Sequence, residues 1–343
     1  MLEETYYKLK KELATEGVFR INNIYGALTV LAELLFFCIS LSLLWHLSPS
    51  SWMYWLLQIL LGISIFRFFV ILHECGHKTL FRQKSLNTLV GYLVSPFCLL
   101  PYIAWRNIHY DHHTWVGVID KDPTQAHLLK LKKSRTMQNL FRVLWRSWLP
   151  IGFIKFTIEV FWLYPLQEFQ QGRSNNGWKG LWSVAIAGVP HVILIASLGF
   201  GRYLTVFSPM LLVFYMWIEN MNLPQHSGLF PYLSDDHPDP IPYAEQDAIT
   251  RTTFLPAILG VLFAYNFNLH IEHHLFPFAP WYRLPRIRQA IRNASGLIYT
   301  EAEFLRFMAE MRSRDPVDIY VKSLPPHASE LPGSLSQAKV SAQ

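Results

Sequence analysis

The sequence predicts an all-α membrane protein in which four transmembrane helices form two hairpins and a cytosolic helical cap carries three histidine-rich segments. Three observations predict this fold. Long apolar runs with almost no charged residues match the thickness of a bilayer. Basic residues gather in the loops at one end of these runs, whereas the links at the other end carry a single charge, Arg202. The histidine-rich segments follow or interrupt apolar runs at that same end.

The composition supports a single membrane domain. The chain has 343 residues, of which 51% are apolar and 15% aromatic. Residues 1–20 are polar and charged, so we expect no secretory signal peptide at this position. The three cysteines lie in or beside apolar runs without metal-ligand spacing, which indicates free thiols. The net charge of +6 suits anionic headgroups or an acidic partner protein, and basic residues that flank apolar spans do not indicate nucleic-acid binding.

The chain is predicted to begin with a cytosolic lead-in helix at 1–21, and the main membrane domain follows at 22–321. The first two spans are predicted at 22–46 and 52–72, because both runs are long and apolar. A short uncharged link joins them. The histidine-rich segment at 73–77 begins where the second span is predicted to end.

The middle of the chain is predicted to stay at the membrane surface. The apolar stretch at 86–104 is short for a span and contains two prolines, so we expect a re-entrant or interfacial segment. Residues 120–148 are polar and basic, and we expect them on the membrane surface. The stretch at 149–167 carries two charges and predicts an interfacial amphipathic helix.

The second hairpin is predicted from spans at about 181–200 and 203–218. Two hairpins place both termini and all histidine-rich segments on one side, which the excess of basic residues marks as cytosolic. A further apolar stretch at 253–267 leads to the last of these segments, and a capping box at 300–303 predicts the start of a helix. The tail at 322–343, rich in Pro, Ser and Ala, is predicted to be disordered.

The three histidine-rich segments, at 73–77, 109–113 and 270–274, hold eight of the fourteen histidines. The spacing places the imidazoles of each segment on one face of a helix. Eight nitrogen donors exceed what one tetrahedral zinc ion can use, so the pattern predicts a two-iron centre and an oxygen-using enzyme. The predicted ligands are His73, His77, His109, His112, His113, His270, His273 and His274.

One further histidine, His226, lies just beyond the fourth predicted span on the metal side. Asn222 precedes it by four residues, one turn if the helix persists that far, although Pro224 disturbs that geometry. A loop histidine facing water is the alternative interpretation of His226.

Other metal chemistries fit parts of the pattern. The segment HECGH at 73–77 also matches the HExxH signature of zinc proteases, in which Glu74 would be the general base, but this leaves the other two segments without a role. A carboxylate-rich diiron bundle needs two Glu-x-x-His pairs, and we find only Glu74 with His77. A non-enzymatic metal-binding receptor is another alternative.

The motifs resemble those of the membrane fatty-acid desaturase family. That family combines HxxxH or HxxxxH, HxxHH and (H/Q)xxHH, and this chain has HECGH at 73–77, HYDHH at 109–113 and HIEHH at 270–274. The run PYIAWR at 101–106 and the LFP that follows the third segment are similar to the delta-12 and omega-3 acyl-lipid branch. The similarity covers roughly residues 50–125 and 215–290.

The resemblance implies two iron ions held by the eight histidines and by a ninth like His226, with Asn222 approaching one iron through water. Glu74, Asp111 and Glu272 could orient the histidines, or could be solvated helix positions. The implied reaction introduces a double bond into a fatty acyl chain with O2 and two external electrons. Relatives with the same motifs hydroxylate or ketolate carotenoids, alkanes or sphingolipids, which is the main alternative.

The implied partners are a lipid-linked or thioester acyl substrate, O2 and an external electron donor. The sequence has no flavin or dinucleotide glycine fingerprint, no cysteine pattern for an iron–sulfur cluster and no fused haem motif. A basic surface on the metal side suits ferredoxin or cytochrome b5 as donor. We expect no catalytic residue beyond the metal ligands.

Overall fold

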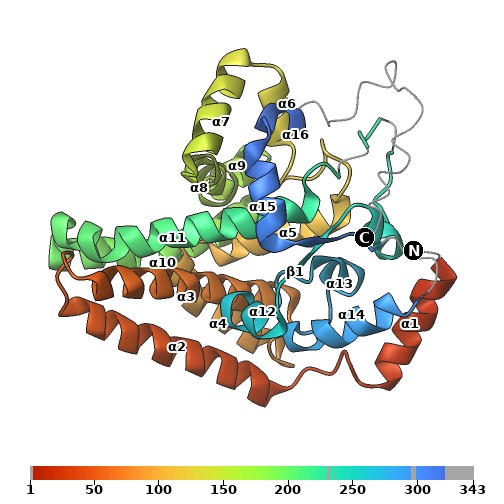
Figure 1. Ribbon diagram of the computed structural model, residues 1–343, viewed down its shortest axis with the longest axis horizontal. Helices are drawn as coiled ribbons and strands as arrows, with labels where there is room; N and C mark the ends of the chain where they lie inside the picture. Colours follow the sequence, from red (N-terminus) through yellow and green to blue (C-terminus); the bar gives the residue numbers. More distant parts are fainter. Residues whose placement is uncertain (1–2, 230–231, 236, 295–298, 321–343) are drawn as a thin grey trace.

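The computed structural model describes residues 3–229, 232–235, 237–294 and 299–320. Four long apolar helices run side by side and form two hairpins (Figure 1). They are α2 (Asn23–Trp45), α3 (Trp52–His77), α10 (Ser174–Leu198) and α11 (Phe200–His226). Each is long enough and apolar enough to cross a bilayer, which confirms the predicted all-α membrane fold.

Helix α3 is the centre of the bundle and packs against α2, α4 and α11. Its Gly62 lets α11 approach closely, because a Cβ at this position would lie 2.5 Å from the side chain of Val213. Large apolar side chains such as Phe66, Phe68 and Phe214 fill the space between these helices and are fully buried. The packing fixes the ends of α3 and α11, where histidines lie.

Helix α3 is longer than predicted. The expected end at 72 is wrong, because the helix continues through the first histidine-rich segment to His77. Lys78 ends it in a left-handed conformation (φ 62°), and the Lys78 N–H donates to the carbonyl of Cys75. His73 and His77 are therefore part of this helix, as their spacing indicated.

Helix α11 also extends beyond its predicted end at 218 and reaches His226. Pro224 was expected to disturb the helix, but the helix continues for two residues beyond it, to His226. The carbonyl groups of this last turn lack helical partners. Arg251 supplies those partners. Its side chain donates to the carbonyl of Pro224 (2.6 Å), and its backbone N–H donates to that of Gln225 (2.8 Å).

Between the hairpins, α4 (Lys84–Cys98) and α5 (Tyr102–Trp115) meet at an angle of 102°. Leu99 adopts a left-handed conformation (φ 51°) at the bend. The sharp turn matches the predicted re-entrant segment at 86–104. It returns the chain to the end of α3 that carries the first histidines.

An arm of short helices follows α5 and appears at the top of Figure 1. It comprises α6 (His127–Lys132), α7 (Arg135–Ser147), α8 (Ile151–Thr157), the π-helix η1 (Ile158–Trp162) and α9 (Tyr164–Gln170). The single amphipathic helix predicted at 149–167 is wrong, because three short pieces occupy this stretch. Pro165, at the start of α9, cannot donate to a continuing helix.

The remaining elements form a cap around the histidine-bearing end of the bundle, in which one helix lies beside α3 and the last two helices contact α11 and α7 of the arm. The elements of the cap are α1 (Glu3–Thr15), η2 (Tyr243–Ala248), β1 (Thr252–Phe254), α12 (Ala257–Ala264), α13 (His270–Leu275), η3 (Trp281–Arg283), α14 (Leu284–Arg292), β2 (Glu301–Glu303), α15 (Phe304–Ser313) and α16 (Pro316–Tyr320). The capping box at 300–303 is wrong, because 301–303 pair with β1 in parallel. Glu303 instead caps α15 with its carboxylate. The predicted tail at 322–343 lies outside the described residues.

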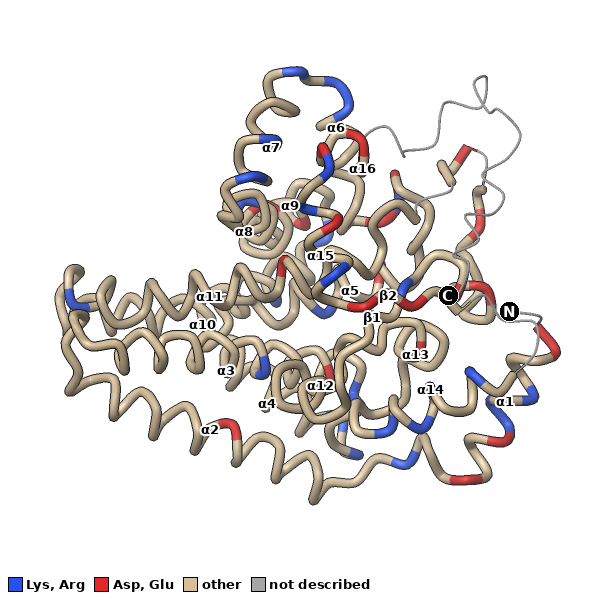
Figure 2. The backbone as a smooth tube through the Cα atoms, in the orientation of Figure 1, with Lys and Arg blue, Asp and Glu red and all other residues tan. Residues whose placement is uncertain are grey.

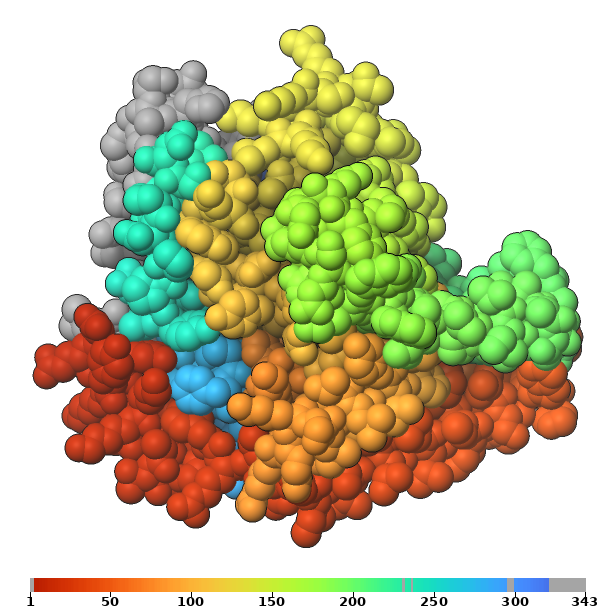
Figure 3. Space-filling view, turned by 180° about the vertical axis from the view of Figure 1, so that it is seen from behind, coloured from red at the N-terminus to blue at the C-terminus, as the bar shows by residue number. Residues whose placement is uncertain are grey.

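Charged residues are concentrated away from the hairpins (Figure 2). The long helices are largely tan in that view, with an acidic segment in α2 and a basic segment in α3. From behind, the hairpin ends project as orange-red and green lobes beyond the broader body (Figure 3). The three cysteines are free, as predicted.

Candidate metal centre

The first two histidine-rich segments meet because α3 and α5 pack closely. Gly76 makes this possible, since a Cβ on it would lie 2.6 Å from the ring of Trp105. The Trp105 indole stacks on His109, with ring centroids 4.5 Å apart. His77 and His109 then place their Nε2 atoms 2.9 Å apart.

The histidines separate into two groups whose candidate ligand atoms lie within 4.8 Å of one another. The first group contains His73, His77, His109 and His273. It joins residues of α3, α5 and α13. Nearly two hundred residues of chain separate α3 from α13. All three histidine-rich segments therefore converge, as predicted.

His113 lies beside this first group. Its Nε2 is 2.9 Å from Nε2 of His273 and 3.1 Å from Nε2 of His109. Its ring also lies 4.3 Å from that of His274, between centroids. His113 is thus placed to join the first group while contacting the second.

The second group contains His112, His226, His270 and His274, all of them buried. His226 projects from the last turn of α11, and its Nε2 lies 2.8 Å from Nε2 of His270. The alternative of a loop histidine facing water is wrong, because His226 is helical and only 6% exposed.

The nitrogen positions fit metal ions. Two ligands at about 2.1 Å from a metal, at right angles, lie about 3 Å apart, which matches the close Nε2 pairs. Nε2 of His73 and Nε2 of His274 are buried without any hydrogen-bond partner. Buried polar atoms left unpaired are costly, and a pair of metal ions would satisfy such atoms.

Several of these rings are fixed from behind by residues that sequence reasoning did not identify. Nδ1 of His112 lies 2.8 Å from the carboxylate of Asp122, and Nδ1 of His274 lies 2.9 Å from Oε1 of Gln246. The third, His226, donates from Nδ1 to the carbonyl of Ile249 (3.1 Å) if that nitrogen is protonated. Each contact leaves Nε2 for a metal.

Asp122 and Gln246 are fully or almost fully buried. Burial alone would raise the pKa of Asp122, but His112 and hydrogen bonds from His112 and Thr124 hold it below its usual value. Asp122 is therefore an ionised carboxylate that can accept a hydrogen bond from a protonated Nδ1 of His112. Neither residue lies at helical spacing from a histidine-rich segment, so the sequence contains no pattern that would have revealed them.

The acidic residues singled out from the sequence have different surroundings. Glu74 lies 3.4 Å from Nδ1 of His73 and accepts hydrogen bonds from Thr79 and from the N–H of Trp281. Glu272 accepts from Thr252 and Tyr299, contacts that hold α13 against β1 and the chain after α14. Asp111 is exposed on α5.

Asn222 lies one turn before His226 on α11 and is half-buried. Its amide nitrogen donates to the carbonyl of Ile218 (2.8 Å). This contact fixes the amide relative to the helix.

The third segment is kept neutral by its surroundings. Burial, reinforced by neighbouring imidazoles, lowers the pKa of His270, His273 and His274 well below the ordinary value. Neutral imidazole is the form that binds a metal ion. Protons therefore compete weakly for these nitrogens near neutral pH.

The family model for fatty acid desaturases matches residues 49–301, which is most of the chain and includes all nine histidines. The chain belongs to the fatty acid desaturase family. The match confirms the resemblance drawn from the histidine motifs, and it makes the protein an oxidoreductase by family. It also removes the zinc protease and the non-enzymatic receptor as interpretations.

Named relatives come from the acyl-lipid branch. The endoplasmic reticulum omega-3 fatty acid desaturase of Vigna radiata is 26% identical over 271 residues, covering 75% of this chain and 70% of that protein. The sn-1 acyl-lipid omega-3 desaturase (ferredoxin) of Nostoc sp. is 26% identical over 288 residues, covering 74% and 72%. The acyl-lipid omega-3 desaturase (cytochrome b5) of Arabidopsis thaliana is 26% identical over 276 residues, covering 75% and 67%.

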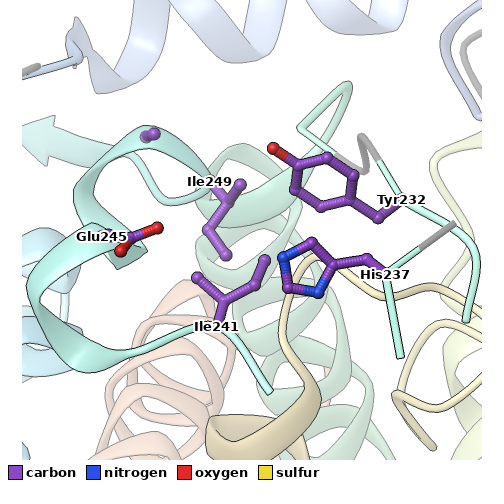
Figure 4. Close-up of a pocket in the computed structure, with 6 residues that line it drawn as sticks. Tyr232, His237, Ile241, Glu245 and Ile249 are labelled. Atoms are coloured by element: carbon purple, nitrogen blue, oxygen red, sulfur yellow. The ribbon is translucent and has the colours of Figure 1, made fainter. Parts of the chain in front are cut away.

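Two cavities lie near the desaturase centre. A small one of about 10 Å³ is lined by His73 and His273 and by the rings of Tyr265 and Trp281. A larger one of about 180 Å³ lies over Ile241 and Ile249, with the rings of Tyr232 and His237 side by side at its edge (Figure 4). None of the candidate metal ligands lines the larger cavity.

Proposed function

We propose that this chain is a diiron acyl desaturase that introduces a double bond into a fatty acyl chain. The observation that carries the proposal is the convergence of nine histidines into two adjacent groups within a fatty acid desaturase fold. A set of neutral nitrogen donors suits redox-active iron better than a hard cation such as magnesium.

The proposed reaction removes two hydrogen atoms from neighbouring methylene groups. One acyl –CH2–CH2– unit, one O2, two electrons and two protons give one –CH=CH– unit and two waters. Reduced iron ions, when bound, would supply the activation of O2 that this reaction needs. We propose that His73, His77, His109, His113 and His273 hold one ion, and that His112, His226, His270 and His274 hold the other.

The surrounding residues have defined tasks in this proposal. Asp122, Gln246 and the Ile249 carbonyl hold three imidazoles in the tautomer that presents Nε2. Asn222 is proposed to contact one ion through water, since it lies one turn from His226. The buried setting excludes bulk water from the reacting carbons.

The electrons are proposed to come from ferredoxin or cytochrome b5, because named relatives use one or the other. The substrate is proposed to be a lipid-linked or thioester acyl chain. Basic residues of the loops near the histidines, against a single Arg202 at the far links, support a cytosolic location for the centre and both termini.

Expression in a host that lacks the activity, followed by fatty-acid mass spectrometry with double-bond localisation, tests the proposal. We expect a new unsaturated acyl chain, about two irons per chain and O2 consumption that depends on reductant. Product carrying oxygen-18 from labelled O2 would instead show hydroxylation or ketolation. His226→Ala should abolish product and lower the iron content, and full activity in that variant would remove His226 from the ligand set.

A further inference from the structure

The short helix α12 has an unusual surface for the cap of a membrane enzyme. No Lys, Arg, Asp or Glu occurs between Arg251 and Glu272. Ile258 is 72% exposed and Leu262 is 50% exposed, so the apolar side chains of α12 do not face the protein interior. In water, such a patch would favour aggregation.

The position of α12 along the bundle is set by contacts with two spans. It packs on α3, and Figure 1 shows it beside that helix. The Tyr265 hydroxyl, just after α12, donates to Glu33 of α2 (2.8 Å). Glu33 is ten residues from the start of α2, a rise of about 15 Å and about half the thickness of a hydrocarbon core.

A charged pair between the two spans receives α12. Arg67 of α3 pairs with Glu33 (2.7 Å between Nε and Oε2), and Ser64 also donates to that carboxylate. The same guanidinium donates to the carbonyl of Leu262 (3.0 Å) in the last turn of α12. An ionisable pair within apolar spans is costly and usually has a role.

Protein side chains donate hydrogen bonds to carbonyl groups in the last turn of α12, as a helix end within a bilayer requires. The Trp217 indole donates to the carbonyl of Phe263 (3.3 Å), next to the carbonyl that Arg67 binds. Irregular backbone is tolerated in a bilayer only where protein groups replace the lost hydrogen bonds. Arg67 and Trp217 therefore supply the hydrogen bonds that water would supply to the end of a surface helix.

The backbone just after α12 has an uncommon conformation that places Tyr265 against Glu33. Tyr265 (φ 43°) and Asn266 (φ 60°) both adopt the left-handed conformation, where helices usually place glycine. Here Tyr265 supplies a side chain that reaches Glu33, and its ring contacts that of Trp281 at a tilt of 42°. Two residues later, Phe267 packs against His73, and α13 begins at His270.

We propose that α12 is inserted into the hydrocarbon of the bilayer beside α2 and α3, and that Glu33 and Arg67 are positioning residues that hold it there. The occupant of its exposed face is the acyl chains of membrane lipid, because that face continues the lipid-facing surface of the spans. Through Tyr265 and Phe267, this anchor sets the position of the third histidine-rich segment. The inference depends on the membrane location and is independent of the substrate and the product.

The location of α12 is tested with a fluorescent non-natural amino acid at position 258, in full-length protein reconstituted in nanodiscs. Leu305 of α15, 70% exposed, is the matched control position. We expect phospholipids brominated on the acyl chain to quench the probe at 258 and iodide to leave it unquenched, with the reverse at 305. Equal quenching by iodide at both positions would overturn the insertion.

The anchoring role is tested with Arg67→Lys, which keeps the charge but cannot bind Glu33 and the Leu262 carbonyl with one planar group. We expect iodide to reach the probe at 258 and the bound metal per chain to fall. Arg202→Lys is the control, because Arg202 also donates to a backbone carbonyl, that of Trp45, at the far end of the bundle.

A double variant, Glu33→Leu with Arg67→Met, removes the pair without leaving one charge unpaired. It decides the question if the single variant does not fold. We expect the same gain of iodide access and loss of metal. An unchanged probe and full metal content in the double variant would show that the pair does not position α12.

Discussion

Gly76 shows how one residue decides whether the histidines can meet. Its Cα faces the Trp105 ring, which in turn stacks on His109. We expect Gly76→Ala to force the indole and the imidazole apart, at a cost of about 1–3 kcal/mol in stability, and to lower the bound metal. Metal analysis of purified protein measures the effect.

Gly152 of α8 is the matched control, because a Cβ there would have nothing within 4 Å. Gly152→Ala should keep the metal and gain about 1 kcal/mol from helix propensity. Equal metal contents in the two variants would show that the contact between α3 and α5 does not control the centre.

Substitution of Asp122 can distinguish a residue that orients an imidazole from one that binds the metal. Asp122→Ala removes the partner of His112 Nδ1 while leaving all nine imidazoles in place. We expect metal affinity to fall by about 10–100-fold, as measured by competition with a chelator. Asp120→Ala is the control, since Asp120 lies in the same loop but accepts from the N–H of Ser234 (2.8 Å). Similar losses in both variants would indicate a general effect of the loop.

The candidate ligands could be predicted from the sequence because helical spacing and clustering are visible along the chain. The residues that orient them could not, because loops bring them in from a distance. Asp122 follows α5 in an irregular stretch, and Gln246 lies in η2. Only tertiary packing shows that each is buried against an imidazole nitrogen.

At the scale of elements, the cap is fastened to the spans by a buried arginine. Arg312 of α15 pairs with Glu219 of α11 (2.8 Å) and lies over the rings of Trp145 and Trp148. We expect Arg312→Ala to destabilise the protein by about 3 kcal/mol, because Glu219 would be left partly buried and unpaired. Thermal unfolding in detergent measures the loss.

The neighbouring Arg314 provides the comparison. It pairs with Glu310 on the exposed side of the same helix, one turn away. Arg314→Ala should cost well under about 1 kcal/mol, as exposed pairs usually do. If the two variants melt at the same temperature, the contact between α15 and α11 is not what holds the cap.

The elements themselves were predictable where length and hydropathy decide them, which is the case for all four spans. Their ends were not. The predicted ends of α3 at 72 and of α11 at 218 are both too early, because the apolar run ends several residues before the helix ends. Contacts such as Arg251 with the Pro224 carbonyl, which no local pattern encodes, continue the second helix to its last histidine.

For the whole molecule, the buried imidazoles make stability depend on pH. His270, His273 and His274 have lowered pKa values in the folded chain, mainly through burial, whereas unfolded histidines titrate near about 6.5. Below that pH the unfolded chain binds protons that the folded chain does not. The metal-free protein should therefore lose stability on acidification, by about 1.4 kcal/mol per pH unit for each such histidine.

Unfolding of chelator-treated protein between about pH 7.5 and pH 5.5 measures this dependence. A transition temperature that stays constant over that range would contradict it. The same linkage predicts that acid releases bound metal, because each imidazole must be neutral to act as a ligand.

The composition of the two histidine groups has a consequence for biogenesis. Each group combines imidazoles from α5 with imidazoles from α13, so neither is complete until the ribosome has synthesised the chain through His274. Helix α1, the first to emerge, also waits for this late segment, since the Tyr6 hydroxyl donates to the carbonyl of Leu275 (3.1 Å). We therefore expect metallation to follow translation of all four spans, and a chain truncated before α13 to bind less metal, because both groups would lack their α13 imidazoles.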